Sequence, residues 1–153
     1  MEDDEGIVQA WFARVQERSE GCMGAGEVVG GIFPAVAKYL KHTPDGDETD
    51  LELRKNLAES LNNVEKLLTT DERKGDFLVG DGQYMTLLDC NLVPKLYHMS
   101  IGLSAFKDNA IDLEVEFPAV NKYMNYMFSR DSFVKTKYPA ETVTWGWGNA
   151  RSS

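Results

Sequence analysis

The sequence predicts an all-α fold. Apolar residues recur three or four positions apart over most of its 153 residues, which is the spacing of one face of a helix. No segment alternates apolar and polar residues as a half-buried β-strand does, and no internal repeat is present. We therefore expect one helical bundle of about five to six helices.

The first half of the chain is expected to hold three of these helices. Apolar spacing predicts a short helix over residues 7–15, which the glycine-containing stretch 19–26 ends. A second helix is expected from about 31 to 42, with Pro34 in its first turn, where the missing N–H costs little. A leucine stripe then predicts the longest amphipathic helix, from about 50 to 68.

The next helix is expected to lie at the centre of the bundle. Thr86 and Asp89 form a capping-box pattern, in which each side chain pairs with the backbone N–H of the other residue. The residues that follow, from Leu87 to Leu103, are apolar around most of the helix surface. Pro94 interrupts this run, so we expect a kink or a compensating hydrogen-bond donor there.

The C-terminal part is expected to hold one long helix, one short helix and a coil. Phe117-Pro118 opens the long helix, and Ser129 or Asp131 is expected to cap a further turn that ends near residue 137. The tail from residue 142 onward is rich in tryptophan and glycine, and we expect it to pack as an ordered coil.

Charge is distributed unevenly along the chain. The 25 acidic and 16 basic residues give a net charge of −9, which disfavours sequence-independent binding to nucleic acid phosphates. Residues 1–117 carry 11 basic and 23 acidic groups, and residues 118–153 carry 5 and 2. The basic C-terminal segment is expected either to dock on the acidic body or to hold a small anion or an acidic partner. No apolar run approaches the roughly 18 residues that would span a bilayer.

The two cysteines indicate a reducing compartment. Cys22 and Cys90 lie far apart and have neither C-x-x-C nor metal-site spacing, so we expect no metal centre and no disulfide framework. The acidic start of the chain lacks the features of a secretory or transit signal.

Several segments resemble a known family. The loop FLVGDGQY, the capping box TLLD and the helix DCNLVPKLYHM resemble the C-terminal helical domain of the glutathione transferase superfamily. Within it, LLDCNLVPKL resembles the intracellular chloride channel family. PKLYHM, FSRDSFVKTK and the late GW pair resemble plant and algal dehydroascorbate reductases more closely. The resemblance covers about residues 30–147.

This resemblance implies glutathione-dependent reduction of dehydroascorbate by a protein with two domains. The family's catalytic cysteine lies in a thioredoxin-like domain that precedes the helical one. We interpret residues 1–29 as an extension or remnant of that first domain and residues 30–153 as the helical domain. Cys22 does not match the family's cysteine-proline motif, and Asp4 stands where the family has a serine that contacts glutathione. We therefore assign no catalytic residue and expect no turnover by this chain alone.

The resemblance assigns two residues to a substrate or glutathione wall, namely His98 and Trp147. The lysine that the family places three positions after this tryptophan is Ala150 here, with Arg151 beside it. Glutathione would be the co-substrate, and an ascorbate-type molecule or another small thiol the ligand.

Each of these residues also has a structural interpretation. His98 can be a hydrogen-bonded structural histidine, Trp145 and Trp147 hydrophobic anchors, and Cys90 a small apolar side chain within its helix. Asp89 is expected to be structural. Three basic residues are expected to form a solvated face: Arg130, Lys135 and Lys137.

Two functions follow. By the first, which the resemblance implies, we expect the chain to be the helical domain of a dehydroascorbate reductase-like protein, in the cytoplasm or the chloroplast stroma. Alternatively, it is a non-catalytic interaction or scaffold subunit, in which a protein partner covers the face that a thioredoxin-like domain would occupy. A membrane role like that of the chloride channel family ranks third, because the membrane-inserting part of that family is its N-terminal one.

Overall fold

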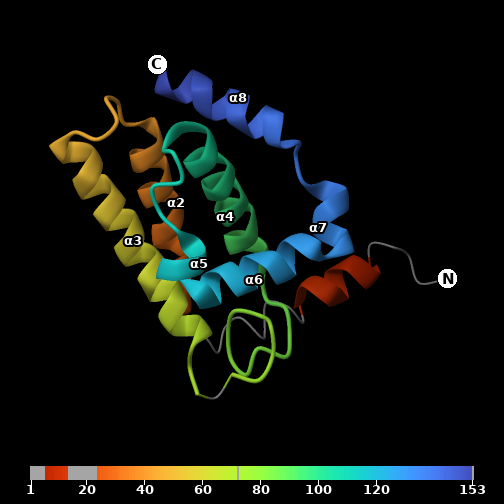
Figure 1. The fold of residues 1–153 in the computed structure, drawn as a ribbon. Coiled ribbons are helices and arrows are strands. Elements are labelled where there is room, and N and C mark those ends of the chain that lie inside the picture. The colour runs from red at the N-terminus through yellow and green to blue at the C-terminus, as the bar shows by residue number, and fades with distance from the viewer. Residues whose placement is uncertain (1–5, 14–23, 72, 153) are drawn as a thin grey trace.

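The computed structural model describes residues 6–13, 24–71 and 73–152, and these residues contain helices and no β-strand (Figure 1). The predicted all-α fold is confirmed. Residues 6–13 form one helix. The later helices are α2 (Ala25–Lys41), α3 (Glu48–Leu68), α4 (Leu87–Phe106), α5 (Leu113–Glu116), α6 (Pro118–Ser129), α7 (Asp131–Thr136) and α8 (Ala140–Arg151).

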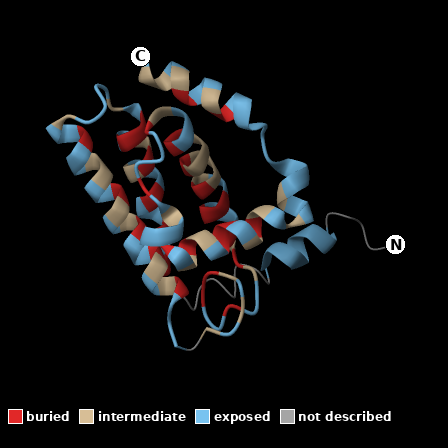
Figure 2. Ribbon diagram, viewed as in Figure 1, coloured by how far each residue is buried: buried red, intermediate tan, exposed pale blue. Residues whose placement is uncertain are grey.

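Helices α2, α3 and α4 form the body of the bundle, and α6 runs across their lower ends in Figure 1. Helix α4 packs against α2, α6 and α8, which confirms its predicted central position. Buried positions face inward on each of these helices (Figure 2), and Ile32, Leu61 and Leu96 are fully inaccessible to solvent. Each such side chain contributes about 1.5–3 kcal/mol by leaving water.

Helix α2 begins earlier than predicted. The prediction placed its start at about residue 31, but the buried positions Ala25, Val29 and Ile32 continue the helical stripe backward. Packing against α3 and α4 therefore outweighs the low helix propensity of glycine. The predicted first helix extends to Val15, which lies outside the described residues, as does Cys22.

Carboxylates cap several helices of the bundle, among them α3 and α6. Asp47 accepts the backbone N–H of Asp50 at 2.7 Å at the start of α3. Glu65, within α3, accepts the N–H groups of Ala119 and Val120 at 2.9 and 2.8 Å. These N–H groups are in the first turn of α6, where no partner exists within the helix, so Glu65 both caps α6 and fixes it to α3.

The loop before α4 closes on itself. The N–H groups of Lys74 and Gly75 both donate to the Asp81 carbonyl, at 2.7 and 2.9 Å, and Phe77 N–H donates to the Gly82 carbonyl at 3.0 Å. A Cβ on Gly75 would lie 2.0 Å from that Gly82 oxygen, so only glycine fits there. The closed loop brings its buried tip, at Leu78, against the start of α4.

The C-terminal tail is helical, and the prediction of a coil was wrong. Residues 140–151 form α8, in which Val143 and Trp147 are four residues apart and both buried. The two glycines of this segment lower its intrinsic helix propensity, but the pair of buried side chains fixes it against α4 and α2. The short helix α5 was also not predicted.

The predicted cap of α7 was also wrong. Arg130 occupies the N-cap position, and no side chain caps the helix. The Ser129 hydroxyl instead donates to the Tyr126 carbonyl within α6 at 2.7 Å.

Helix α4 is continuous through Pro94. Among the described residues, no helix is both long and apolar enough to cross a membrane.

Candidate functional site

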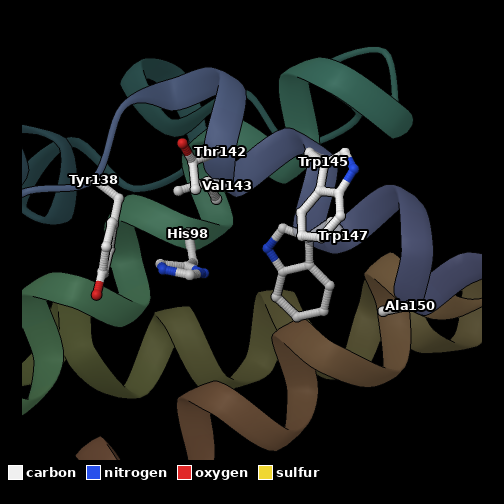
Figure 3. Close-up of a pocket in the computed structure, with 8 residues that line it drawn as sticks. His98, Tyr138, Thr142, Val143, Trp145, Trp147 and Ala150 are labelled. Atoms are coloured by element: carbon white, nitrogen blue, oxygen red, sulfur yellow. The ribbon is translucent and has the colours of Figure 1, made fainter.

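A cavity of about 400 Å³ lies between α4 and α8, and we call it the α4–α8 pocket (Figure 3). It brings together His98 and Trp147, the two residues that the resemblance assigns to a ligand wall. Most of the other side chains that line it are aromatic or aliphatic. The complete lining is His98, Tyr138, Thr142, Val143, Trp145, Gly146, Trp147 and Ala150.

His98 projects from the second half of α4 into this pocket, as Figure 3 shows. Its ring is half-buried, and burial lowers the pKa of the imidazole. The ring is therefore neutral at pH 7, with one nitrogen as donor and the other as acceptor. The structure records no hydrogen bond from this ring to another described residue, so the expected alternative of a hydrogen-bonded structural histidine finds no support here.

Trp147 forms the opposite wall. The centroids of its ring and the His98 ring are 6.3 Å apart, with the planes nearly perpendicular, and its ring also lies 6.2 Å from that of Phe33. The indole nitrogen lies on the ring edge that faces His98 in Figure 3. This Nε1–H is buried and has no hydrogen-bond partner among the described residues. An unpaired buried donor costs about 1–3 kcal/mol, and a ligand oxygen would remove that cost.

Of the two roles expected for the basic C-terminal segment, docking on the acidic body is the one that the contacts of Arg151 support. Ala150 lines the pocket, but Arg151 turns away from it and binds the Leu40 carbonyl and the Asp45 carboxylate. Arg151 therefore docks the basic tail on the acidic body and supplies no charge to the pocket. Trp145 is 71% exposed, so its interpretation as a hydrophobic anchor was wrong.

Tyr138 is a lining residue that the sequence analysis missed. It lies between α7 and α8, and its carbonyl accepts the Tyr97 hydroxyl from α4 at 2.9 Å. The residue is 68% exposed and lies at the edge of the pocket. Helical periodicity gave no signal for Tyr138, because it lies in the connection between two helices.

The capping box forms as predicted. The Thr86 N–H and hydroxyl donate to Asp89 Oδ2 at 2.8 and 3.1 Å. The second oxygen, Oδ1, accepts the Leu78 N–H at 2.9 Å and the Tyr123 hydroxyl at 2.8 Å. Burial and the Asp89 charge raise the pKa of Tyr123, so its hydroxyl remains a donor. Asp89 is fully buried and joins α4, α6 and the preceding loop, which supports its structural role.

Cys90 lines a second cavity, of about 360 Å³, together with Trp11, Pro94, Arg130 and Phe133 among others. The residue is exposed, which corrects the expectation that it packs as a small apolar side chain. Desolvation by its neighbours and the charge of Asp89 raise the pKa of the Cys90 thiol. At neutral pH it is therefore a thiol rather than a nucleophilic thiolate.

The three basic residues expected on a solvated face behave differently from one another. Arg130 is partly buried and lies over the rings of Phe77 and Tyr126, at 5.2 and 5.7 Å. Lys135 and Lys137 are exposed, as expected. Within the described part of the chain, no group of three or more histidine, cysteine, aspartate or glutamate side chains is arranged to hold a metal ion.

Comparison of the sequence with known proteins identifies relatives of this chain. The sequence profile of the family "Glutathione S-transferase, C-terminal domain" matches residues 26–131. The chloroplastic glutathione S-transferase DHAR3 of Arabidopsis thaliana is 34% identical over 116 residues, which cover 76% of this chain and 41% of that protein. DHAR2 of the same plant is 33% identical over 116 residues, which cover 50% of its length.

A rice relative shows the same pattern. The probable cytosolic glutathione S-transferase DHAR1 of Oryza sativa subsp. japonica is 33% identical over 116 residues, 49% of its length. The chain thus spans about half the length of the curated relatives it matches. These relatives are plant dehydroascorbate reductases, as the resemblance in the α4 and α6–α7 segments indicated.

Proposed function

The chain belongs to the glutathione S-transferase C-terminal domain family, and we propose that it forms the helical half of a glutathione-dependent dehydroascorbate reductase. One observation carries the proposal. His98 and Trp147 come from different helices and meet in one pocket, each with a polar group that has no hydrogen-bond partner among the described residues. Both groups can bind oxygen atoms of a small ligand.

The described residues would bind and orient the ligand rather than react with it. The neutral His98 imidazole can donate to one ligand oxygen or accept from a hydroxyl, and the Trp147 N–H donates to another. The reaction consumes two glutathione thiols for each dehydroascorbate and yields ascorbate and glutathione disulfide, so it needs a reactive thiolate. Cys90 is a poor candidate because its thiol pKa is raised. We assign the thiolate to a thioredoxin-like half that acts together with this domain.

A turnover experiment tests the proposal. The purified 153-residue chain is mixed with glutathione and dehydroascorbate, alone and with a thioredoxin-like half from a DHAR relative, and ascorbate is followed by its ultraviolet absorbance. We expect ascorbate formation only in the mixture, and a loss of at least about ten-fold in His98→Asn or Trp147→Phe. Turnover by the chain alone that disappears in Cys22→Ser would instead assign the nucleophile to Cys22.

The second candidate function is an interaction or scaffold subunit, and the helix of residues 6–13 supports it. Ile7, Val8, Trp11 and Phe12 are each 41–51% exposed on this helix, which leaves an apolar surface for another protein to cover. Light scattering coupled to size exclusion separates the two functions. A stable complex with a non-thioredoxin-like protein would favour the scaffold, and a clean monomer would weaken it.

We also propose a reducing compartment, either the cytoplasm or the chloroplast stroma. The named relatives include chloroplastic and cytosolic proteins, so both compartments are represented among them.

A further inference from the structure

Helix α8 is attached to the bundle by little apolar surface. Of its twelve residues only Val143 and Trp147 are buried, whereas α2 buries six residues. Just before α8 the Tyr138 carbonyl accepts the Tyr97 hydroxyl. An element with so few buried side chains opens locally at lower cost than the core helices. The polar contacts at its ends therefore contribute a large share of what holds it.

Arg151 makes the contacts at the C-terminal end of α8. Its guanidinium donates to the Leu40 carbonyl, one of the last carbonyls of α2, which have no partner within that helix. It also donates to both carboxylate oxygens of Asp45, at 3.2 and 3.0 Å. Its carbon Cζ lies 5.2 Å from the centroid of the Phe106 ring at the end of α4. One side chain thus joins α8 to α2, to the loop after α2 and to α4.

Asp45 is shared with a second cation. Lys107 follows α4, and its side chain is 1% exposed; its Nζ donates to Asp45, to Asp50 and, at 3.2 Å, to the His42 carbonyl. Burial opposes ionisation of Asp45, but the hydrogen bonds from Lys107 and Arg151 outweigh it and hold the pKa of Asp45 below its usual range. The two negative charges, on Asp45 and Asp50, are therefore balanced by the positive charges of Lys107 and Arg151. Asp45 is the exposed member, with 48% of its side chain accessible to water and salt.

The attachment acts on the pocket wall through the helix itself. Trp147 and Arg151 are four residues apart, so they lie one above the other on the same face of α8. Trp147 lines the α4–α8 pocket and packs against His98 and Phe33. If Arg151 is released, the last turn of α8 loses its attachment, and the position of the indole is then set by apolar contact alone.

We propose that Arg151 is a positioning residue for the α4–α8 pocket, because its bonds to Asp45 and the Leu40 carbonyl hold Trp147 against His98. Since Asp45 is accessible to water, the attachment weakens as ionic strength rises. Salt therefore loosens the wall that Trp147 forms. Ligand binding in this pocket rests on the proposed function, whereas the attachment of α8 does not.

Hydrogen exchange of the Trp147 indole N–H reports the attachment directly. The chain has three tryptophans, so the full-length ¹⁵N-labelled protein gives three indole resonances, which Trp11→Phe and Trp145→Phe assign. We expect exchange of the Trp147 N–H to accelerate about three- to ten-fold in Arg151→Ala, the range for a charge-assisted contact at a partly exposed site. Raising NaCl from 20 mM to 500 mM should accelerate exchange in the wild type and have little effect in Arg151→Ala.

Two variants separate positioning from general destabilisation. Arg151→Lys keeps the charge but not the fork of donors, so exchange should lie between the wild type and Arg151→Ala. Lys135→Ala removes an exposed ion pair with Asp131 on α7, at 3.9 Å, and should leave exchange unchanged. If Arg151→Ala leaves the Trp147 exchange rate unaltered, or changes it equally at both salt concentrations, the inference is wrong.

A binding measurement then tests the link to the ligand. Calorimetry with glutathione should give a dissociation constant that rises in Arg151→Ala, because the apparent constant equals the intrinsic one divided by the fraction of molecules in which α8 is closed. A dissociation constant that stays the same although the exchange rates show that the closed fraction has fallen would overturn the link between α8 and the pocket. Absence of glutathione binding to the wild type would count against the proposed function, and indole exchange alone would then decide the role of Arg151.

Discussion

The buried carboxylate of Asp89 should be among the most sensitive positions in the molecule. It is fully buried and accepts four hydrogen bonds, two from backbone N–H groups and two from hydroxyls. Asp89→Ala leaves the donors of Leu78, Thr86 and Tyr123 without their partner. Each unpaired buried donor costs about 1–3 kcal/mol, and part of the set can relax together, so we expect a loss of about 3–5 kcal/mol.

Urea unfolding followed by far-ultraviolet circular dichroism measures this loss. For a chain of this size, 3–5 kcal/mol lowers the melting temperature by about 10 °C or more. Asp89→Asn keeps the shape and one acceptor but turns an amide N–H₂ toward two donors, so it should cost nearly as much. A loss below about 1 kcal/mol for Asp89→Ala would refute the reasoning, because it would mean that water replaces the carboxylate.

A double-mutant cycle isolates one bond of this set. Tyr123→Phe removes a single donor and should cost about 1–2 kcal/mol in the wild type but far less in Asp89→Asn. Tyr138→Phe is the matched control, because Tyr138 is exposed, and it should change stability by less than about 0.5 kcal/mol. Additive effects of Tyr123→Phe and Asp89→Asn would show that the two groups do not interact.

Three further predictions concern packing, pH and capping. Gly102→Ala places a Cβ 2.3 Å from Cδ1 of the fully buried Leu40 and should lower the free energy of unfolding by about 1–3 kcal/mol. Gly31→Ala meets open space in α2 and should raise it by about 0.5–1 kcal/mol, and chemical denaturation of both variants measures the two effects. Burial lowers the pKa of His98, so the unfolded chain binds more protons near pH 6, and the free energy of unfolding should fall as the pH drops through about 6.5. Unfolding at pH 7.5 and at pH 5.5 measures this fall, and His98→Gln should remove the part that His98 contributes. The same pH dependence in His98→Gln and in the wild type would contradict the prediction. Glu65→Gln removes the charge from the cap of α6 and should cost about 1 kcal/mol in thermal unfolding, with an effect near zero as the contrary result.

The helices that periodicity predicted are those whose apolar residues are numerous. Helix α3 buries Leu57, Leu61, Val64 and Leu68 along one stripe, and that stripe alone located it to within two residues at its start. Helix α8 buries only two side chains among glycines and an exposed tryptophan, so its local sequence carried little helical signal. Its conformation depends on contacts with α2 and α4, which the local sequence does not contain.

The same distinction applies to polar contacts. The capping box was predictable because Thr86 and Asp89 are three residues apart and the pairing is local. Tyr123, which completes the Asp89 site, is far along the chain, and nothing in its own helix indicates that its hydroxyl reaches a carboxylate. Glu65 is likewise an unremarkable residue of α3 until the fold brings the start of α6 to it.

The candidate site could be predicted only through resemblance. His98 and Trp147 have no shared local pattern, and their meeting depends on α8 crossing the end of α4. The resemblance supplied both residues, and the structure adds Tyr138 at the pocket edge. The outcome at Arg151 needed the structure, because a basic residue one helical turn after Trp147 can face either the pocket or the rest of the protein.

The two ends of α4 explain why one wall of the pocket should be rigid and the other adjustable. Buried Asp89 lies at the N-terminal, positive end of the α4 dipole, and buried Lys107 lies at its C-terminal, negative end. Each charge is paired or hydrogen-bonded, so displacing either end of α4 would leave a buried charge unpaired, at a cost of several kcal/mol. His98 is therefore held on a helix fixed at both ends, whereas Trp147 is on a helix whose end is held through the exposed carboxylate of Asp45. Changes in salt should accordingly move the tryptophan wall and leave the histidine wall in place.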